Sequence, residues 1–274
     1  MTPSPSFFYR LYYIKENGVY NHDAIDFMHM LYEDYGDESI EMFFCDLPYT
    51  FKGKNRVTAN SWDLPIDDKE FFEIALRMLT KDGCIALTSS QPFTSYLVMN
   101  HLDCFKYEWI WEKDNGSNFV SVKHQPFKVH ESILIFGKSA ITYNKAERYM
   151  KYNPQFTKGE PYKVKRKGMT SNLAVINGYE RTDGEYGGKR YPRSVLKFNC
   201  QKGLHPTQKP VDLFKEIILT YTNKGDTVVD ICTGSGTTAE ACIKTERNFI
   251  VNDNNFKYYN VTNERINKIS KQIK

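Results

Sequence analysis

The stretch from residue 227 to residue 252 constrains the fold of this 274-residue chain more than any other. It predicts a strand over 227–231, a tight turn with two glycines, a helix over 237–245 and a second strand over 248–252. The turn has the sequence Asp230-Ile231-Cys232-Thr233-Gly234-Ser235-Gly236-Thr237-Thr238. Because it leads directly into a helix, it places free backbone N–H groups and the positive end of a helix dipole at one point. An anionic or strongly polar ligand group is favoured there.

The same alternation of strands and helices runs through the rest of the chain. Helices are expected over 24–35, over 67–80, after Gln91-Pro92-Phe93 and over 211–222. Strands are expected near Val19 and over 39–45, 84–88, 107–112 and 132–136, with a turn at Lys81-Asp82-Gly83. This order predicts an α/β fold with a mainly parallel sheet and helices on both faces. The chain is long enough for one large core and a smaller lobe.

Residues 143–193 interrupt this alternation. They are rich in Lys, Gly, Asn and Tyr, and they show little apolar periodicity. Between Lys145 and Arg193 there are twelve Lys or Arg and five Asp or Glu, an excess of seven in a chain whose net charge is +4. We therefore expect an inserted lobe or long loops that face a polyanionic partner.

The cysteines and the amino-terminal residues indicate a cytosolic protein. The six cysteines form no CxxC pair and have no zinc-ligand spacing, so we expect buried, reduced thiols and no metal site. Residues 1–6 have no basic segment followed by an apolar stretch, and no run approaches the roughly 18 apolar residues of a membrane span. We expect a soluble protein in the cytoplasm, with no membrane partner.

Asp253 follows Gly234 by nineteen residues and ends a predicted strand, which is the place of a ribose-binding acid in a dinucleotide fold. Gly234, Gly236 and Ala239 also satisfy the pattern G-x-G-x-x-A. A nicotinamide-dependent oxidoreductase is therefore one alternative. Only 38 residues follow Gly236, so this alternative requires a permuted chain order.

Three motifs in one order resemble a known family. Asp46-Leu47-Pro48-Tyr49, the run His205-Pro206-Thr207-Gln208-Lys209-Pro210 and the turn at 230–238 are similar to motifs of the amino-methylating DNA methyltransferases. These enzymes use S-adenosylmethionine to methylate adenine N6 or cytosine N4. The order here, with the catalytic motif first and the cofactor motif last, resembles the permuted β arrangement of that family. The resemblance implies a catalytic part over 1–142, a target-recognition lobe over 143–200 and a cofactor-binding part over 201–274.

The chemistry of this family explains the residues of the first motif. An exocyclic amine on a base is a poor nucleophile, since its lone pair is delocalised into the ring. Asp46 can accept one of its N–H groups and the backbone carbonyl of Leu47 the other, which turns the nitrogen lone pair towards the methyl group. Pro48 keeps Leu47 extended, and Tyr49 can stack on a base that has left the helix. An acid at position 46 favours adenine, because cytosine-N4 enzymes of this kind more often carry Ser there.

The resemblance also assigns the cofactor site. It implies that S-adenosylmethionine is bound by the following residues: Asp23, Thr207, Lys209, Asp230, Gly234, Ser235, Gly236, Thr237 and Asp253. Asp23 has the alternative role of a helix N-cap, and Lys209 that of a solvated charge. His205 is expected to be structural. The chain departs from the family pattern at Leu47, His22 and Ile231-Cys232, where Pro, Gly and Pro-Phe are usual.

Two basic groups are expected to contact double-stranded DNA. They are Lys163, Lys165, Arg166 and Lys167 in the lobe, and Lys52, Lys54 and Arg56 after the catalytic motif. We therefore predict a site-specific DNA adenine-N6 methyltransferase from a microbe or phage. The alternatives are a cytosine-N4 enzyme, an inactive methyltransferase-like DNA-binding protein and an RNA target. A homodimer and a cognate restriction enzyme are the further partners that the resemblance suggests.

Overall fold

The computed structural model describes residues 13–50, 64–142, 146–164, 184–201, 203–204 and 207–273. The chain divides into two compact units, of which the larger combines Met1–Asn153 with Ser194–Lys274 and the smaller is Pro154–Arg193. None of the helices in the described ranges has both the length and the apolar character needed to span a membrane.

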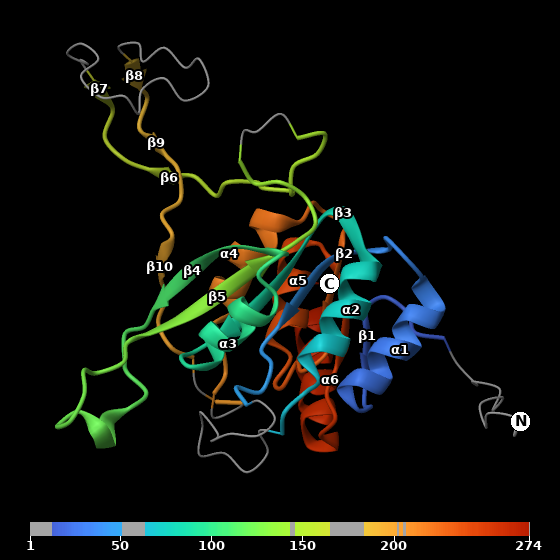
Figure 1. Ribbon diagram of the computed structural model, residues 1–274. Helices are drawn as coiled ribbons and strands as arrows, with labels where there is room; N and C mark the ends of the chain where they lie inside the picture. The colour runs from blue at the N-terminus through green and yellow to red at the C-terminus, as the bar shows by residue number, and fades with distance from the viewer. Residues whose placement is uncertain are drawn as a thin grey trace, which may run out of the picture. The chain divides into compact units, whose positions relative to one another are not determined.

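An eight-stranded sheet forms the centre of the larger unit, with the strand order β1-β12-β11-β2-β3-β5-β4-β10 (Figure 1). Its strands are β1 (Gly18–Tyr20), β2 (Ile40–Cys45), β3 (Leu79–Ser89), β4 (Phe105–Glu112), β5 (His130–Phe136), β10 (Val195–Lys197), β11 (Thr227–Asp230) and β12 (Asn248–Asn252). β5 runs antiparallel to its neighbours β3 and β4, and the other pairs are parallel. The predicted mainly parallel sheet is confirmed.

Helices cover both faces of this sheet, as predicted. α1 (Ala24–Tyr35), α2 (Asp68–Met78) and α3 (Phe93–Asn100) pack on one face, where β2 contributes Phe43 and Cys45. α4 (Val211–Tyr221) and α5 (Thr237–Thr245) pack on the other, where β2 contributes Met42 and Phe44. Successive side chains of a strand point to opposite faces, so one continuous apolar run serves two cores.

The segments of the larger unit that differ from the sequence expectations include β10, a strand of the central sheet that the sequence pattern does not predict. The turn predicted at Lys81-Asp82-Gly83 lies inside β3, which begins at Leu79, and the register is irregular opposite residues 40–42. The extra residues are thus absorbed in the strand rather than in a separate turn. The sequence pattern predicts no element over 256–273, but Phe256–Ile273 is helix α6, which packs against α5 and β1.

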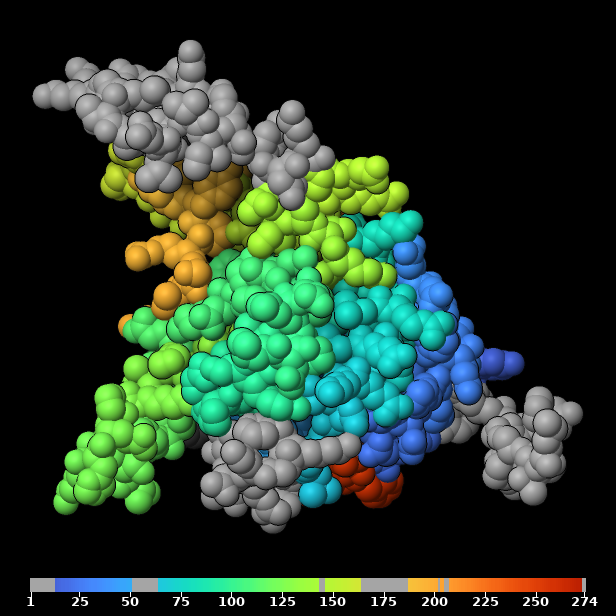
Figure 2. Space-filling view, viewed as in Figure 1, coloured from blue at the N-terminus to red at the C-terminus, as the bar shows by residue number. Residues whose placement is uncertain are grey.

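The smaller unit contains two short antiparallel strand pairs. β6 (Thr157–Lys158) pairs with β9 (Lys189–Arg190), and β7 (Tyr162–Val164) pairs with β8 (Gly184–Tyr186). Cations lie over aromatic rings here, with Lys189 Nζ 3.7 Å from the ring centre of Phe156 and Arg190 Cζ 4.4 Å from that of Tyr162. Figure 2 shows the surface of the whole chain from the direction of Figure 1.

Candidate active site

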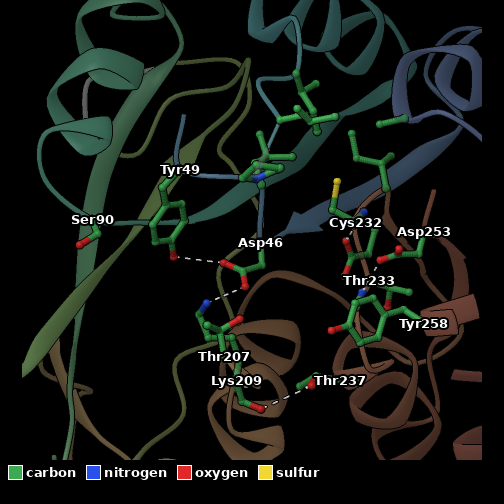
Figure 3. Close-up of a pocket in the computed structure, with 18 of the residues that line it drawn as sticks. Asp46, Tyr49, Ser90, Thr207, Lys209, Cys232, Thr233, Thr237, Asp253 and Tyr258 are labelled. Carbon is green, nitrogen blue, oxygen red and sulfur yellow. Dashed lines mark hydrogen bonds and ion pairs between the residues drawn. The ribbon is translucent and has the colours of Figure 1, made fainter. Parts of the chain in front are cut away.

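Asp46 and the glycine turn, far apart in the sequence, line one cavity of about 970 Å³. The cavity lies where β1, β12, β11, β2 and β3 end, because the carboxyl ends of neighbouring parallel strands share one edge of a sheet. Asp46 follows β2, Asp230 ends β11 and Asp253 follows β12. Figure 3 shows Asp46 and Tyr49 on one side of the cavity and Asp253 and Tyr258 on the other.

The Asp46 carboxylate accepts hydrogen bonds from three side chains. Lys209 Nζ lies 2.6 Å from Oδ2, Tyr49 Oη lies 3.1 Å from Oδ1, and Thr88 Oγ1 also donates to Oδ1. Burial alone would raise the pKa of Asp46, but Lys209 first, and then Thr88 and Tyr49, hold it below its usual value. Asp46 is therefore ionised at neutral pH. Its side chain is 26% exposed, so a ligand N–H group can still reach it.

Lys209 is the counter-ion of Asp46. Its side chain is only 8% exposed, and its Nζ also lies 3.6 Å from Glu131 Oε2. Burial lowers the pKa of Lys209, but Asp46 and Glu131 together raise it above its usual value, so the ammonium group keeps its charge. The alternative of a solvated charge is therefore wrong. Thr237 Oγ1 donates to the Lys209 carbonyl at 3.4 Å, which joins this segment to the start of α5.

Glu131, on β5, is part of this charge network and was not predicted. It accepts a hydrogen bond from Lys113 Nζ, and Tyr49 Oη lies 3.4 Å from its Oε2. Burial, and then the charges of Asp46 and Glu131, raise the pKa of Tyr49 well above its usual value. The Tyr49 hydroxyl is therefore neutral and can donate a hydrogen bond. Its ring stacks on Phe93, with the ring centres 5.7 Å apart.

The glycine turn adopts a backbone that requires glycine. Gly234 has φ +56° and Gly236 has φ +78°, both in the left-handed region. A Cβ atom at Gly236 would lie 2.9 Å from Thr262 Cγ2 of α6. Thr262 Oγ1 also donates to the Gly234 carbonyl at 3.0 Å, and Arg265 Nη1 donates to the Ser235 carbonyl at 2.7 Å. Helix α6 thus packs against the turn and stabilises its backbone.

Asp230 is almost completely buried at the start of this turn. It accepts a hydrogen bond from the Cys232 backbone N–H at 3.0 Å and another from Thr238 Oγ1. Burial, opposed in part by these donors, raises the pKa of Asp230 from 3.8 to about 7. The ionisation of Asp230 at neutral pH therefore depends on the charge of a ligand in the cavity.

Asp253 and Thr233 offer further polar groups. Asp253 accepts the backbone N–H of Gly234 at 2.8 Å and that of Asn255 at 2.9 Å, and burial raises its pKa. Each carboxylate oxygen retains one lone pair for a ligand. Thr233 Oγ1 is buried and has no hydrogen-bond partner among the described residues. Since buried polar groups are normally paired, this hydroxyl is suited to a ligand.

The other predicted site residues are placed as follows. Leu47, Pro48, Thr207 and Ser235 line the cavity. Asp23 lines it as well and caps α1, since its Oδ1 accepts the Ile25 N–H at 2.9 Å.

The predicted DNA contacts are described only in part. Lys163 is an exposed residue of β7 in the smaller unit. The remaining six lie outside the described residues, as does His205: Lys52, Lys54, Arg56, Lys165, Arg166 and Lys167.

The sequence matches the DNA methylase family over residues 40–264. The DNA adenine methyltransferase YhdJ of Escherichia coli (strain K12) is 31% identical over 248 residues, which cover 85% of this chain and 78% of that protein. The type II methyltransferase M2.MboI of Moraxella bovis is 26% identical over 281 residues, which cover 95% of this chain and 91% of the relative.

Solved structures have the same fold. The M1.HpyAVI–SAM complex aligns with a TM-score of 0.58 at 23% identity, covering 90% of this chain and 98% of that one. The cytosine-N4-specific PvuII DNA methyltransferase aligns with a TM-score of 0.63 at 15% identity, covering 96% of this chain and 94% of that one.

Proposed function

Because this chain belongs to the DNA methylase family, we propose that it transfers a methyl group from S-adenosylmethionine to N6 of adenine in double-stranded DNA. One observation carries the proposal. The Asp46-Leu47-Pro48-Tyr49 motif and the glycine turn line the same cavity, and Asp46 is held ionised there by Lys209. A hydrogen-bond acceptor for the target amine and a cofactor site thus lie next to each other.

The cavity residues fit S-adenosylmethionine, which supplies an electrophilic methyl group when it is bound. Asp253 can accept ribose hydroxyl groups, and the Thr233 hydroxyl, which has no partner among the described residues, gains one. The buried Asp230 suits a cationic ligand, because a positive charge nearby stabilises its ionised form. The backbone N–H groups at the start of α5 suit a carboxylate.

The base is held by the other side of the cavity. Asp46 accepts one N–H of the exocyclic amine and the Leu47 carbonyl accepts the other, which directs the nitrogen lone pair away from the ring. Pro48 restricts Leu47 to an extended backbone, and Tyr49 provides an aromatic surface for the base. Since Asp46 has a lowered pKa, it works as an acceptor that stabilises positive charge on the attacking nitrogen.

Adenine is supported by the acid at position 46 and by the 31% identity to a DNA adenine methyltransferase. Cytosine N4 is the second candidate, since the cytosine-N4-specific PvuII enzyme has the same fold. Membership of the methylase family decides against the nicotinamide-dependent alternative. The inactive alternative rests on Leu47, His22 and Cys232, where the chain departs from the family pattern.

Asp46→Asn tests the proposal, because it keeps the side-chain shape and removes the charge. Wild type and variant are incubated with DNA and labelled S-adenosylmethionine, and the nucleosides are analysed by mass spectrometry. We expect N6-methyladenine from the wild type and a rate at least about 10²-fold lower from the variant. Asp26→Asn, an exposed acid on α1 outside the cavity lining, is the matched control.

Cofactor binding measured by calorimetry separates a catalytic defect from a folding defect in the same experiment. We expect Asp46→Asn to bind S-adenosylmethionine within about 10-fold of the wild type, since Lys209 is the one predicted cofactor residue for which a contact with the Asp46 side chain is described. Full activity of the variant would remove Asp46 from the mechanism. A wild type that binds no cofactor would instead favour the inactive alternative.

The finer assignments are part of the same proposal. We infer that the basic groups around Lys163 and after Tyr49 contact DNA phosphates and that residues 143–200 recognise the target site. Charge reversal across 163–167 should weaken DNA binding and flatten its salt dependence. A homodimer, a cognate restriction enzyme and a cytoplasmic location in a microbial or phage-infected cell stay predictions.

A further inference from the structure

The loop between β4 and β5, residues 113–129, stands out from the surface of the larger unit (Figures 1 and 2). Its base is firmly braced. The Lys113 N–H donates to the Val129 carbonyl at 2.8 Å, and the Asn118 side chain accepts the Lys128 N–H at 2.7 Å and donates to the Pro126 carbonyl at 3.0 Å. This bracing holds the tip, a short 3₁₀ helix over Phe119–Ser121, in a defined place.

The tip of the loop exposes apolar side chains to solvent. Phe119 is 77% exposed and Val120 is 95% exposed, and Val122 nearby is 41% exposed. Single exposed apolar residues are common on protein surfaces and need no explanation. Neighbouring exposed apolar residues at the tip of a hydrogen-bonded loop are different. The hydrogen bonds at the base of the loop hold these side chains in solvent, whereas a less constrained loop could bury them.

The charges of the loop select a polyanionic partner. Asp114, at the base of the loop, accepts the Cys200 N–H at 2.6 Å, and the rest of the loop has no acidic side chain, whereas Lys123, His124 and Lys128 are all present. An apolar tip followed by the cations Lys123 and Lys128 matches a duplex, which has phosphates on its surface and apolar base faces inside.

The loop also borders the proposed active site. Ser117, Asn118, Gln125 and Lys128 line the same cavity as Asp46. Phe119 follows Asn118 directly, so the apolar tip begins one residue beyond the cavity lining. A duplex that places one base in the cavity therefore brings its neighbouring base pairs to this tip.

We propose that Phe119 and Val120 enter the base stack of the DNA at the position from which the target base is extruded. The inference rests on the proposed function of the cavity and adds the element that opens the duplex. A base that leaves the stack loses its stacking and pairing, and its neighbours face a gap. An inserted aromatic ring restores stacking there, while Lys123 and His124 contact the adjoining phosphates.

The test uses the double variant Phe119→Ala, Val120→Ala, with Leu102→Ala as the matched control. Leu102 is 59% exposed and outside the cavity lining. Two duplexes carry the methylation site identified by sequencing the wild-type product. In one the target base is paired, and in the other an abasic residue stands opposite it, which lowers the free energy needed for extrusion.

We expect the double variant to methylate the paired duplex about 10-fold to 100-fold more slowly than the wild type, as the loss of one stacked aromatic side chain implies. On the abasic duplex its rate should lie within about 3-fold of the wild type, since extrusion then needs little help. Leu102→Ala should match the wild type on both. Calorimetry with S-adenosylmethionine checks that each variant is folded.

An equal loss of methylation rate on the two duplexes would overturn the inference. A general defect in binding or folding would lower the rate whether or not the target base is paired. An unchanged rate on the paired duplex would also overturn it, while leaving the proposed function intact. A wild type that methylates neither duplex nor genomic DNA would overturn both. Sedimentation with anionic vesicles that requires Phe119 and Val120, without any difference between the duplexes, would assign the tip to a lipid surface instead.

Discussion

Replacing Glu131 by Gln should destabilise the protein strongly, although it changes only one oxygen into an NH₂ group. Four side chains alternate in charge across the cavity wall: Lys113, Glu131, Lys209 and Asp46. Lys113 is 9% exposed and Lys209 is 8% exposed, so neither can turn its ammonium group to water. Glu131→Gln leaves these two buried cations with Asp46 as the one remaining acid of the four.

The expected magnitude follows from burial. Removing one partner of a buried ion pair typically costs about 3 to 5 kcal/mol, because a buried charge is left uncompensated. Gln can still accept a hydrogen bond from one lysine, so we expect a loss near the lower limit, about 3 kcal/mol. For a protein of this size that corresponds to a melting temperature lower by roughly 6 to 10 °C.

Glu112→Gln is the matched control, since Glu112 lies at the end of the neighbouring strand β4 and also pairs with a lysine. Its Oε1 is 3.1 Å from Lys197 Nζ, but the side chains are 43% and 70% exposed. An exposed pair contributes less than about 1 kcal/mol. Urea unfolding and thermal unfolding of both variants at pH 7 provide the comparison. A loss in Glu131→Gln no larger than that in Glu112→Gln would refute the burial argument.

Three further outcomes are expected. Because burial raises the pKa of Asp230 from 3.8 to about 7, the folded protein binds a proton between these values that the unfolded chain has lost. Stability should therefore fall as pH rises through this window, and the affinity for cationic S-adenosylmethionine should rise up to about pH 7. Asp230→Asn should remove both trends in calorimetry. Gly236→Ala should cost more in urea unfolding than Gly225→Ala, by about 1 kcal/mol, since both have positive φ but only Gly236 faces Thr262. Thr233→Val should leave stability unchanged or raise it by about 1 kcal/mol while weakening cofactor binding, because the wild-type hydroxyl is buried and unpaired among the described residues.

The elements that could be predicted from the sequence are those whose limits are marked by the local residues and whose apolar pattern matches the face that is buried. Helices α1 and α5 and strand β12 begin and end at the predicted residues, since an N-cap, a glycine turn or a short apolar run marks their limits. Helix α6 was missed because its buried face includes Thr262, which is fully buried, and Ile269 seven residues later. A polar residue in that position weakens the apolar periodicity on which a helix prediction rests.

The same distinction applies to the site. Asp46 and the glycine turn follow parallel strands, and because the ends of such strands meet at one edge, the sequence alone predicts that they lie together. Glu131 carries no comparable signal, since an acid next to His130 resembles any solvated charge. Only the antiparallel direction of β5 brings its first residues to that edge. Lys209 is likewise a buried counter-ion only through the arrangement of β2, β5 and the segment that precedes α4.

The charge of the cavity explains why a base would have to enter it without its backbone. Six acidic and two basic side chains are among the described residues that line it: Asp23, Asp46, Asp67, Glu131, Asp230, Asp253, Lys128 and Lys209. This excess of acids favours a cationic cofactor and opposes any phosphate. Lys123 and His124, by contrast, are exposed on the loop outside the lining. The acidic cavity can accept a neutral base but repels phosphates. The phosphates of the duplex must therefore stay outside it, near Lys123 and His124. Extrusion of the base is then the arrangement that satisfies both.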